Sequence, residues 1–259
     1  MLLKNNPYSG ELTGKPMTEP ILKDNKQKKQ KWQQQLATVA LFATPIFLLT
    51  YYFNDHPYKA ELARRTVSLS QYSREQRLNF ITAARALDGA VIEPSQTFSF
   101  NAKVGPRTGS RGFVPAGSYL GGSRVSSEGG GICLISSCLY QAALLSGLQV
   151  KERAAHTTCV RSVPPGLDAT VWYGKADLKL VNPYKQPVQI RCESSSAPEE
   201  LIISIVGSDD MKAQAKSRQL RRRELAFDGR NLLVEVYLDG DAQKKNQSSL
   251  VSRDSYRLP

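Results

Sequence analysis

The chain has 259 residues, 41% of them hydrophobic, which is enough to bury the core of one ordinary domain and excludes disorder throughout. The formal net charge is +12; the first 35 residues hold seven lysines against three acidic residues, which leaves about +8 for the remainder. A basic surface suits an anionic lipid or polymer, but nucleic acid is not an expected partner, because no zinc-finger spacing, aromatic RNA-binding signature or P-loop accompanies the charge.

The N-terminal part predicts a membrane anchor. Residues 1–35 are polar and basic, which is typical of a solvated cytoplasmic tail. Residues 36–53 then run for 18 residues without a charge, about the minimum for a transmembrane helix, and Trp32, Tyr51 and Tyr52 stand where interfacial aromatic residues occur. The lysines before this segment place the N-terminus in the cytoplasm and the rest of the chain outside. The alternatives are a buried helix and a cleaved signal peptide; no A-x-A-like cleavage site follows the segment.

The folded part is expected to begin with a helix. After a connector at 54–72, a Ser73 cap opens a helix over 73–88, with apolar residues at helical spacing. Short strands are expected at 91–92 and 97–100.

A glycine-rich stretch at 101–131 predicts a long shaped loop, and loops of that length in a compact domain are usually functional. A helix is expected over 132–148. Strand-like runs follow it, separated by turn signals, at 156–163, 168–173, 177–182, 187–193 and 200–206.

A helix followed by such an antiparallel meander is an α+β pattern. We therefore expect an α+β domain over 73–207. The remainder, 208–259, is basic and holds two Asp-Gly hairpin turns, so it is expected to form a β-ribbon extension.

One cysteine stands where a nucleophile would be activated. Cys133 follows Gly129, Gly130 and Gly131 and lies in the first turn of the predicted helix. A helix N-terminus lowers the pKa of a thiol and presents free backbone N–H groups. Glycines let a substrate approach the backbone. We expect these glycines, together with Ser136, to form the oxyanion and substrate loop.

A base and its orienter are found downstream of Cys133. His156 is the only histidine of the predicted domain, and Asp168 and Asp177 follow on the next two predicted strands. This order of cysteine, histidine and carboxylate is that of papain-like and transglutaminase-like enzymes. If a hairpin turns at 164–166, its register brings Asp177 toward the histidine and leaves Asp168 several residues away. Asp177 is therefore the favoured orienter and Asp168 the alternative.

Each of these residues also has a structural interpretation. A cysteine at a helix start is often a small buried hydrophobe, and a histidine on a strand is often structural. Cys138 is expected to pack on another helix face, while Cys159 and Cys192 either form a disulfide or stay free. The absence of a CxxC pair and the presence of only two histidines predict no metal site, and no cofactor is expected.

Several segments between residues 79 and 207 carry a family resemblance. They are FSFN at 98–101, VGPRT at 104–108, GF at 112–113, GGGIC at 129–133, SS at 136–137 with LY at 139–140, ER at 152–153 with His156, PGLDATV at 165–171, and DL at 177–178 with Asn182. On these segments the chain resembles the VanW family, named from accessory proteins of bacterial glycopeptide-resistance clusters. It departs from the family pattern at Leu134, where Gln is usual, and at Cys138, where Thr is usual.

The resemblance implies a bacterial cell-envelope protein with L,D-transpeptidase activity on peptidoglycan stem peptides through the cysteine. A Gln beside the nucleophile would donate to the oxyanion, so Leu134 implies a weakened or altered site. Three functions compete: a cysteine acyltransferase, a non-catalytic module that binds peptidoglycan or its precursors, and a structural envelope protein with an inert cysteine. In each case we expect a single-pass plasma-membrane protein anchored through 36–53.

Overall fold

The computed structural model describes residues 31–32, 34–35, 58–120, 123–197, 199–215, 217–240 and 248–258. The chain divides into two compact units, Met1–His56 and Pro57–Pro259. The predicted span at 36–53 lies outside the described residues. Within the described ranges, no helix has both the length and the apolar character that crossing a membrane requires.

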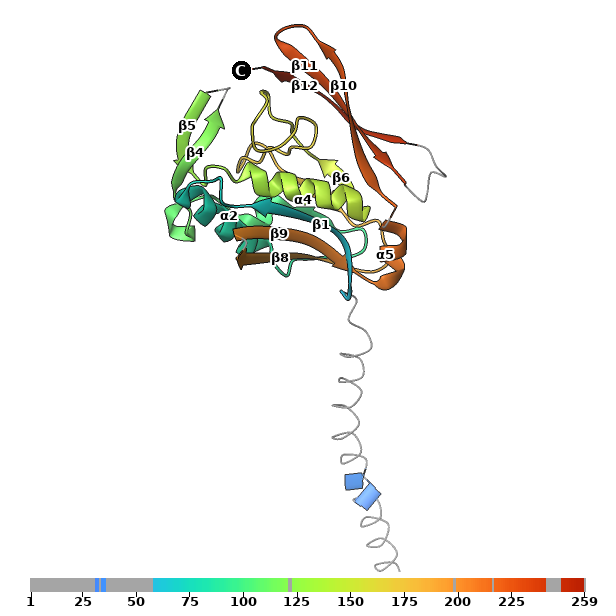
Figure 1. Cartoon of the computed structure of the whole chain (residues 1–259). Coiled ribbons are helices and arrows are strands. Elements are labelled where there is room, and N and C mark those ends of the chain that lie inside the picture. The colour runs from blue at the N-terminus through green and yellow to red at the C-terminus, as the bar shows by residue number, and fades with distance from the viewer. Residues whose placement is uncertain are drawn as a thin grey trace, which may run out of the picture. The chain divides into compact units, whose positions relative to one another are not determined.

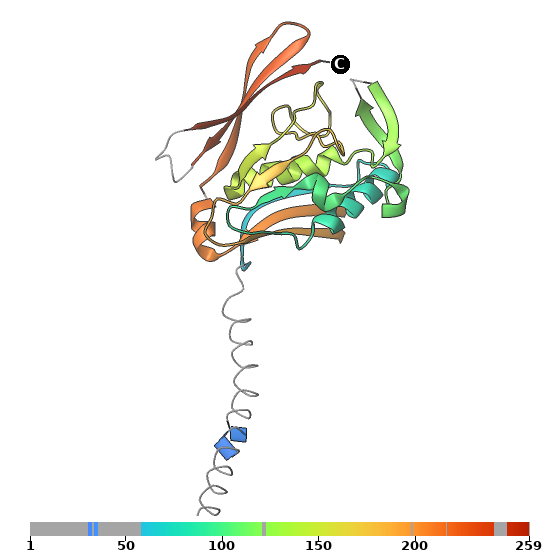
Figure 2. The ribbon, with the colours of Figure 1, turned by 180° about the vertical axis from the view of Figure 1, so that it is seen from behind.

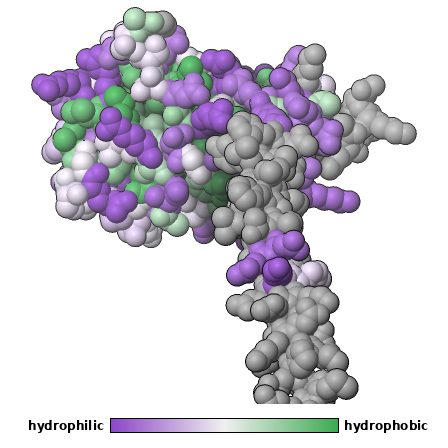
Figure 3. All heavy atoms as spheres, turned by 90° about the horizontal axis from the view of Figure 1, so that it is seen from below, coloured by the Kyte–Doolittle hydropathy of each residue, from purple (hydrophilic) through white to green (hydrophobic). Residues whose placement is uncertain are grey.

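The second unit is a mixed α+β fold with antiparallel sheets, as predicted. Its main sheet has the order β1-β9-β8-β2 with all neighbours antiparallel. The strands are β1 Ala60–Ser68, β9 Glu199–Gly207, β8 Val188–Ser196 and β2 Val91–Ile92. Figure 1 shows helix α4, Cys133–Ser146, packed on one face of this sheet beside β1 and β9. Seen from below, in Figure 3, hydrophilic side chains are spread among apolar ones.

The core lies between the sheet and two helices, α4 and α2, Arg74–Leu87. Phe80, Leu87, Ile135 and Leu139 contribute fully buried side chains from the helices, and Ile203 contributes one from the sheet. The predicted Ser73 cap is confirmed, because its side chain accepts from the Gln76 backbone and the Gln76 side chain accepts in return from the Ser73 N–H.

Residues 60–68 were expected to be a connector, but they form the edge strand β1, which pairs with β9. A register shift between Glu61 and Ala63 breaks the alternation of buried and exposed residues that would reveal this strand in the sequence.

A second sheet has the order β3-β7-β6, with β3 at Thr97–Ser99, β7 at Lys179–Val181 and β6 at Gln149–Glu152. The strands predicted at 177–182, 187–193 and 200–206 correspond to β7, β8 and β9. The strands predicted at 156–163 and 168–173 are not regular. The chain there makes only isolated bridges, including Ala154 with Thr170, and its polar groups bond buried side chains instead.

The glycine-rich stretch at 101–131 is not one long loop. It contains helix α3, Phe100–Val104, a short 3-10 helix at Gly109–Arg111, and a hairpin of β4, Pro115–Leu120, with β5, Ser123–Glu128.

The predicted C-terminal ribbon is a three-stranded sheet that follows helix α5, Asp209–Ala215. Its strands are β10 Gln219–Phe227, β11 Asn231–Asp239 and β12 Ser249–Arg257. The last strand returns to the domain, because Arg257 bridges Thr158 and its N–H donates to the Thr157 carbonyl. Figure 2 shows this sheet beside the irregular loops that carry the candidate site. The C-terminus is therefore an integral part of the fold.

Candidate active site

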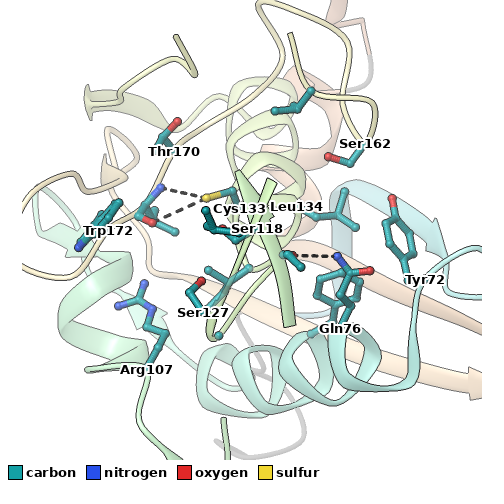
Figure 4. A pocket seen from close by; sticks show the side chains of 18 of the residues that line it. Tyr72, Gln76, Arg107, Ser118, Ser127, Cys133, Leu134, Ser162, Thr170 and Trp172 are labelled. Atoms are coloured by element: carbon teal, nitrogen blue, oxygen red, sulfur yellow. Dashed lines mark hydrogen bonds between the residues drawn. The ribbon is translucent and has the colours of Figure 1, made fainter. Parts of the chain in front are cut away.

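A cavity of about 720 Å³ opens at the N-terminal end of α4. Its walls come from α2, the β4–β5 hairpin and the irregular segments near residues 160 and 171. Cys133, His156, Arg107 and Trp172 line it together, and Figure 4 shows the labelled side chains around this space. The structure thus brings the predicted nucleophile and base into one cavity.

Cys133 is the first residue of α4, as predicted. Its Sγ accepts from the Val171 N–H at 3.5 Å and lies 3.7 Å from the Val171 carbonyl (Figure 4). In the described part of the chain, the backbone N–H of Cys133 donates to no protein acceptor. This N–H is therefore free to donate to the oxygen of a carbonyl group that the sulfur would attack.

The three glycines before the cysteine serve close packing. Gly129 and Gly131 have φ of 71° and 89°. A Cβ on Gly130 would lie 2.1 Å from the Ala116 carbonyl oxygen, and one on Gly131 would lie 2.9 Å from Phe80. Of these three glycines, Gly129 and Gly131 line the cavity and Gly130 does not. The predicted loop thus lies at the site. The absence of a side chain at Gly130 and Gly131 is required because the β4–β5 hairpin and α2 pack closely against them.

Ser136 does not belong to that loop. Its side chain is fully buried. Its hydroxyl lies 2.6 Å from the Ala169 carbonyl oxygen and 3.1 Å from the Cys133 carbonyl oxygen and donates to them. The Ser137 hydroxyl accepts from the Ala169 N–H at 2.9 Å. The two serines therefore fasten the strand-like segment of Val171 to α4, which holds Val171 against the sulfur.

The structure pairs His156 with Asp168. The Asp168 Oδ2 lies 2.6 Å from His156 Nδ1 and also accepts the His156 backbone N–H at 2.7 Å. The antiparallel bridge between Ala154 and Thr170 explains this, because the same register sets His156 opposite Asp168 two positions on.

The preference for Asp177 as orienter was wrong. Its carboxylate accepts from the Ser99 hydroxyl at 2.5 Å, the Asn101 N–H at 2.9 Å and the Leu178 N–H at 2.8 Å. Asp177 thus fixes the start of α3 and makes no hydrogen bond to His156. The predicted hairpin register failed because the segment around 164–166 is a wide loop with no strand pairing.

The histidine and its carboxylate form a charged pair. Burial lowers the pKa of His156, but the bond to Asp168 and the interaction with Cys133 outweigh it and raise that pKa to about 9. Burial raises the pKa of Asp168, but bonds from His156 and Tyr256 bring it down to about 2. At neutral pH the cavity that Cys133 lines therefore holds an imidazolium fixed by a buried carboxylate.

A second layer of side chains holds Asp168. Its Oδ1 accepts from the Tyr256 hydroxyl at 2.5 Å and from Arg153 Nη2 at 3.0 Å, and Arg153 Nη1 bonds Asp254 at 2.6 Å. The Gly166 N–H donates to the Tyr256 oxygen at 2.7 Å. Sequence reasoning missed Tyr256 and Asp254, because they stand on β12, far along the chain, with no local motif.

The other three cysteines do not line the cavity. All four are free thiols, so Cys159 and Cys192 form no disulfide. Burial raises the pKa of both Cys138 and Cys192 to about 12, and burial also raises the pKa of Cys159. Among the residues that the structure describes, no group of His, Cys, Asp or Glu side chains is arranged to hold a metal ion.

At neutral pH, iodoacetamide should therefore label Cys133 at least about tenfold faster than Cys138, Cys159 or Cys192, because only the thiolate reacts. Peptide mapping by mass spectrometry after brief treatment of the folded protein measures the four rates. Faster labelling of Cys138 or Cys159 would contradict the assignment of the nucleophile.

Comparison with known proteins shows which family and which relatives the chain resembles. Residues 75–206 match the family model described as "VanW like protein". The chain is 35% identical over 156 residues to the uncharacterized protein YoaR of Bacillus subtilis (strain 168), which covers 60% of this chain and 51% of that protein. It is 30% identical over 118 residues to the vancomycin B-type resistance protein VanW of Enterococcus faecalis (strain ATCC 700802 / V583), which covers 43% and 42% respectively.

This chain spans about half or less of the length of these two relatives. No solved structure matches it significantly. Because the family model covers just over half of the chain and every segment that forms the Cys133–His156–Asp168 site, the chain belongs to the VanW-like protein family.

Proposed function

We propose that this protein is a cysteine acyltransferase that acts on peptidoglycan stem peptides in the bacterial cell envelope, with the activity of an L,D-transpeptidase. The observation that carries the proposal is the convergence of Cys133, His156 and Asp168. A thiol at a helix N-terminus beside a carboxylate-held imidazolium is the arrangement of an activated cysteine nucleophile.

In the proposed reaction, the Cys133 thiolate attacks an amide carbonyl of the donor stem, and the developing oxyanion bonds the free Cys133 N–H. The C–N bond breaks, the leaving amine takes a proton from His156, and a thioester remains. An amine of a second stem then attacks the thioester and gives its proton to His156. The new amide forms as the C–S bond breaks and the thiolate returns.

The envelope setting of this proposal rests on two supports. One relative is named a vancomycin B-type resistance protein, which agrees with the cell-envelope setting that the family resemblance implies. The uncharged segment at 36–53 would anchor the protein in the plasma membrane as a single-pass protein, with the N-terminus in the cytoplasm and the domain outside.

A second candidate function is a module that binds peptidoglycan or its precursors without turnover. Leu134 favours it, because this buried apolar side chain lines the cavity where the family pattern has a potential oxyanion donor. The free Cys133 N–H favours the enzyme, since it supplies a donor that does not depend on the side chain at 134.

Trapping of the acyl-enzyme distinguishes the two. The purified domain is incubated with a disaccharide tetrapeptide and analysed by intact and peptide mass spectrometry. The enzyme is expected to carry the stem acyl group on Cys133, and the Cys133→Ala variant is expected to carry none. Binding of the muropeptide with no adduct and no cross-linked dimer would favour the binding module.

Replacing Tyr256 by Phe should lower kcat/KM about tenfold, since it removes a charge-assisted hydrogen bond worth about 1.5–3 kcal/mol from Asp168. Burial raises the pKa of Tyr256, so the phenol stays protonated and donates. The loss should leave Asp168 less firmly placed on the histidine, and NMR titration of His156 measures that directly.

Tyr237 supplies the matched control. It stands on β11 of the same sheet, and its hydroxyl bonds Glu235. Tyr237→Phe should leave both kcat/KM and the titration of His156 unchanged. Equal effects of the two substitutions would show that β12 acts only through the stability of the sheet.

A further inference from the structure

Arg107 is a cation of the cavity that the reaction above does not use. It lies in the segment before the short 3-10 helix, and Figure 4 shows its guanidinium directed into the space shared with Cys133 and Trp172. Its guanidinium lies 5.5 Å from the Phe100 ring centroid and 6.0 Å from that of Tyr173.

The guanidinium is held in place by neutral groups. Nη1 donates to the Gly105 carbonyl at 2.7 Å, and Nη2 donates to Asn101 Oδ1 at 2.6 Å. Asn101 is itself fixed, because its amide donates to the Ala176 carbonyl at 2.7 Å. A Cβ on Gly129 would lie 2.6 Å from Arg107 Cγ, so the first glycine before the cysteine makes room for this side chain.

Within the described residues no acidic side chain forms an ion pair with Arg107, and the Asp177 carboxylate acts on its charge only from beyond ion-pair distance. A guanidinium has five N–H donors, and the structure gives protein acceptors to two of them. Burial lowers the pKa of Arg107 and so disfavours its charge, and an anionic ligand in direct contact with the guanidinium would offset that cost.

We propose that Arg107 is a carboxylate-binding subsite, which selects acyl donors whose leaving group is an amino acid with a free α-carboxylate. This rests on the proposed acyl transfer. The planar fork of a guanidinium matches a carboxylate, and a single guanidinium balances its one charge, whereas a phosphate dianion would be left half compensated.

In the first step, the thiolate forms its C–S bond with the carbonyl carbon, and the C–N bond to the leaving amino acid breaks. The leaving amine takes its proton from His156, and the carboxylate of the same amino acid stays on Arg107 until it departs. The subsite therefore lies on the leaving-group side of the scissile bond, and the acceptor stem enters after it is vacated.

Alkylation of Cys133 tests the subsite without requiring turnover. Iodoacetate and iodoacetamide transfer groups of nearly equal size to the same sulfur, but only the first carries a carboxylate. The ratio of their rate constants cancels the thiolate fraction. In the wild-type domain this ratio should exceed that of free glutathione by about tenfold, the size of one charge-assisted hydrogen bond. Arg107→Gln should lower the ratio about tenfold relative to the wild type, a comparison in which the charge of His156 is common to both proteins.

The control is Arg111→Gln, which removes the same charge from an exposed neighbour that bonds the Val104 carbonyl and does not line the cavity. Its ratio should equal that of the wild type. Arg107→Lys, which keeps the charge and loses the fork, should give an intermediate ratio and guards against misfolding of the glutamine variant. An unchanged ratio in Arg107→Gln, or an equal fall in Arg111→Gln, would overturn the subsite.

Donor specificity supplies the second arm. Tetrapeptide donors with a free or an amidated terminal carboxylate are compared by kcat/KM. The wild type should prefer the free acid about tenfold or more, and Arg107→Gln should lose that preference. If neither donor reacts while the alkylation ratio behaves as expected, the acyl transfer fails and the anion site stands. If both donors react equally in the wild type, the subsite fails and the acyl transfer stands.

Discussion

Asp168→Asn should lower kcat/KM by roughly 10³–10⁴-fold, whereas Asp177→Asn should leave it within a few-fold of the wild type. Asp168 accepts from His156 on Oδ2 and from Tyr256 and Arg153 on Oδ1. An asparagine carries no negative charge for the imidazolium, and its NH2 group would face donors on one of these two sides. The pKa of His156 should also fall from about 9 in Asp168→Asn, because the largest contribution that raises it is lost. Steady-state kinetics and NMR titration of His156 measure the two effects.

Asp177 is the matched control, because both aspartates are buried acceptors of several hydrogen bonds. Asp177→Asn should lower the melting temperature, since it weakens the bonds that hold Ser99 and the start of α3. A loss of turnover in Asp177→Asn without a loss of stability would return the orienting role to that residue.

The same pair makes stability depend on pH. The pKa of His156 is raised in the folded state from its ordinary value of 6.5 to about 9, so its contribution is fully present below 6.5 and is lost as pH rises through 9. The pKa of Asp168 is lowered from 3.8 to about 2, so its contribution is present above 3.8 and is lost as pH falls through 2. The stability difference between wild type and Asp168→Asn should therefore narrow above pH 9.

Local signals predicted the parts of the fold that depend on neighbouring residues. Ser73 and Gln76 stand three residues apart and cap α2 as the capping box requires. Cys133 follows its glycines into the first turn of α4. The sequence also predicted that Cys133 and His156 lie in one site, and both residues line the same cavity.

The sequence-based predictions failed where a contact depends on irregular backbone pairing or on residues far apart in the chain. The carboxylate partner of His156 depends on the register of an irregular loop. The Ala154–Thr170 bridge shifts that register by several residues from the predicted one, so His156 faces Asp168 and not Asp177. Tyr256 reaches Asp168 from β12 across 88 positions of sequence, so no window of neighbouring residues contains the contact. The glycines illustrate a third limit: their spacing showed that something approaches the backbone, but not that it is Ala116, Phe80 and the stem of Arg107.

The family model ends at residue 206, before the C-terminal sheet that supplies Tyr256 and Asp254. The segment that the sequence indicated as an extension therefore supplies part of the layer of side chains behind His156 and Asp168. Arg153 joins the two regions, since it bonds Asp168 on one side and Asp254 on the other.

Cys133→Ala and His156→Ala should each lower kcat/KM by about 10⁴-fold or more, and the double variant should lose little beyond either one. The reason is that, in the proposed reaction, the histidine acts only through steps at the sulfur, because it protonates the leaving amine and receives the acceptor's proton. Once the sulfur is gone, no thioester forms and these proton transfers have nothing to assist. The assay is formation of cross-linked dimer from purified muropeptides.

Cys138→Ala is the control for the loss of a cysteine from the same helix. Cys138 is buried among core side chains and does not line the cavity, so this variant should keep its turnover and lose stability by about 1 kcal/mol, the cost of a small cavity. Two independent losses that add in the double variant would mean that His156 serves a step without the sulfur, such as binding of the stem. Full turnover in Cys133→Ala would remove the basis for acyl transfer altogether, because the other three thiols lie where burial keeps them protonated.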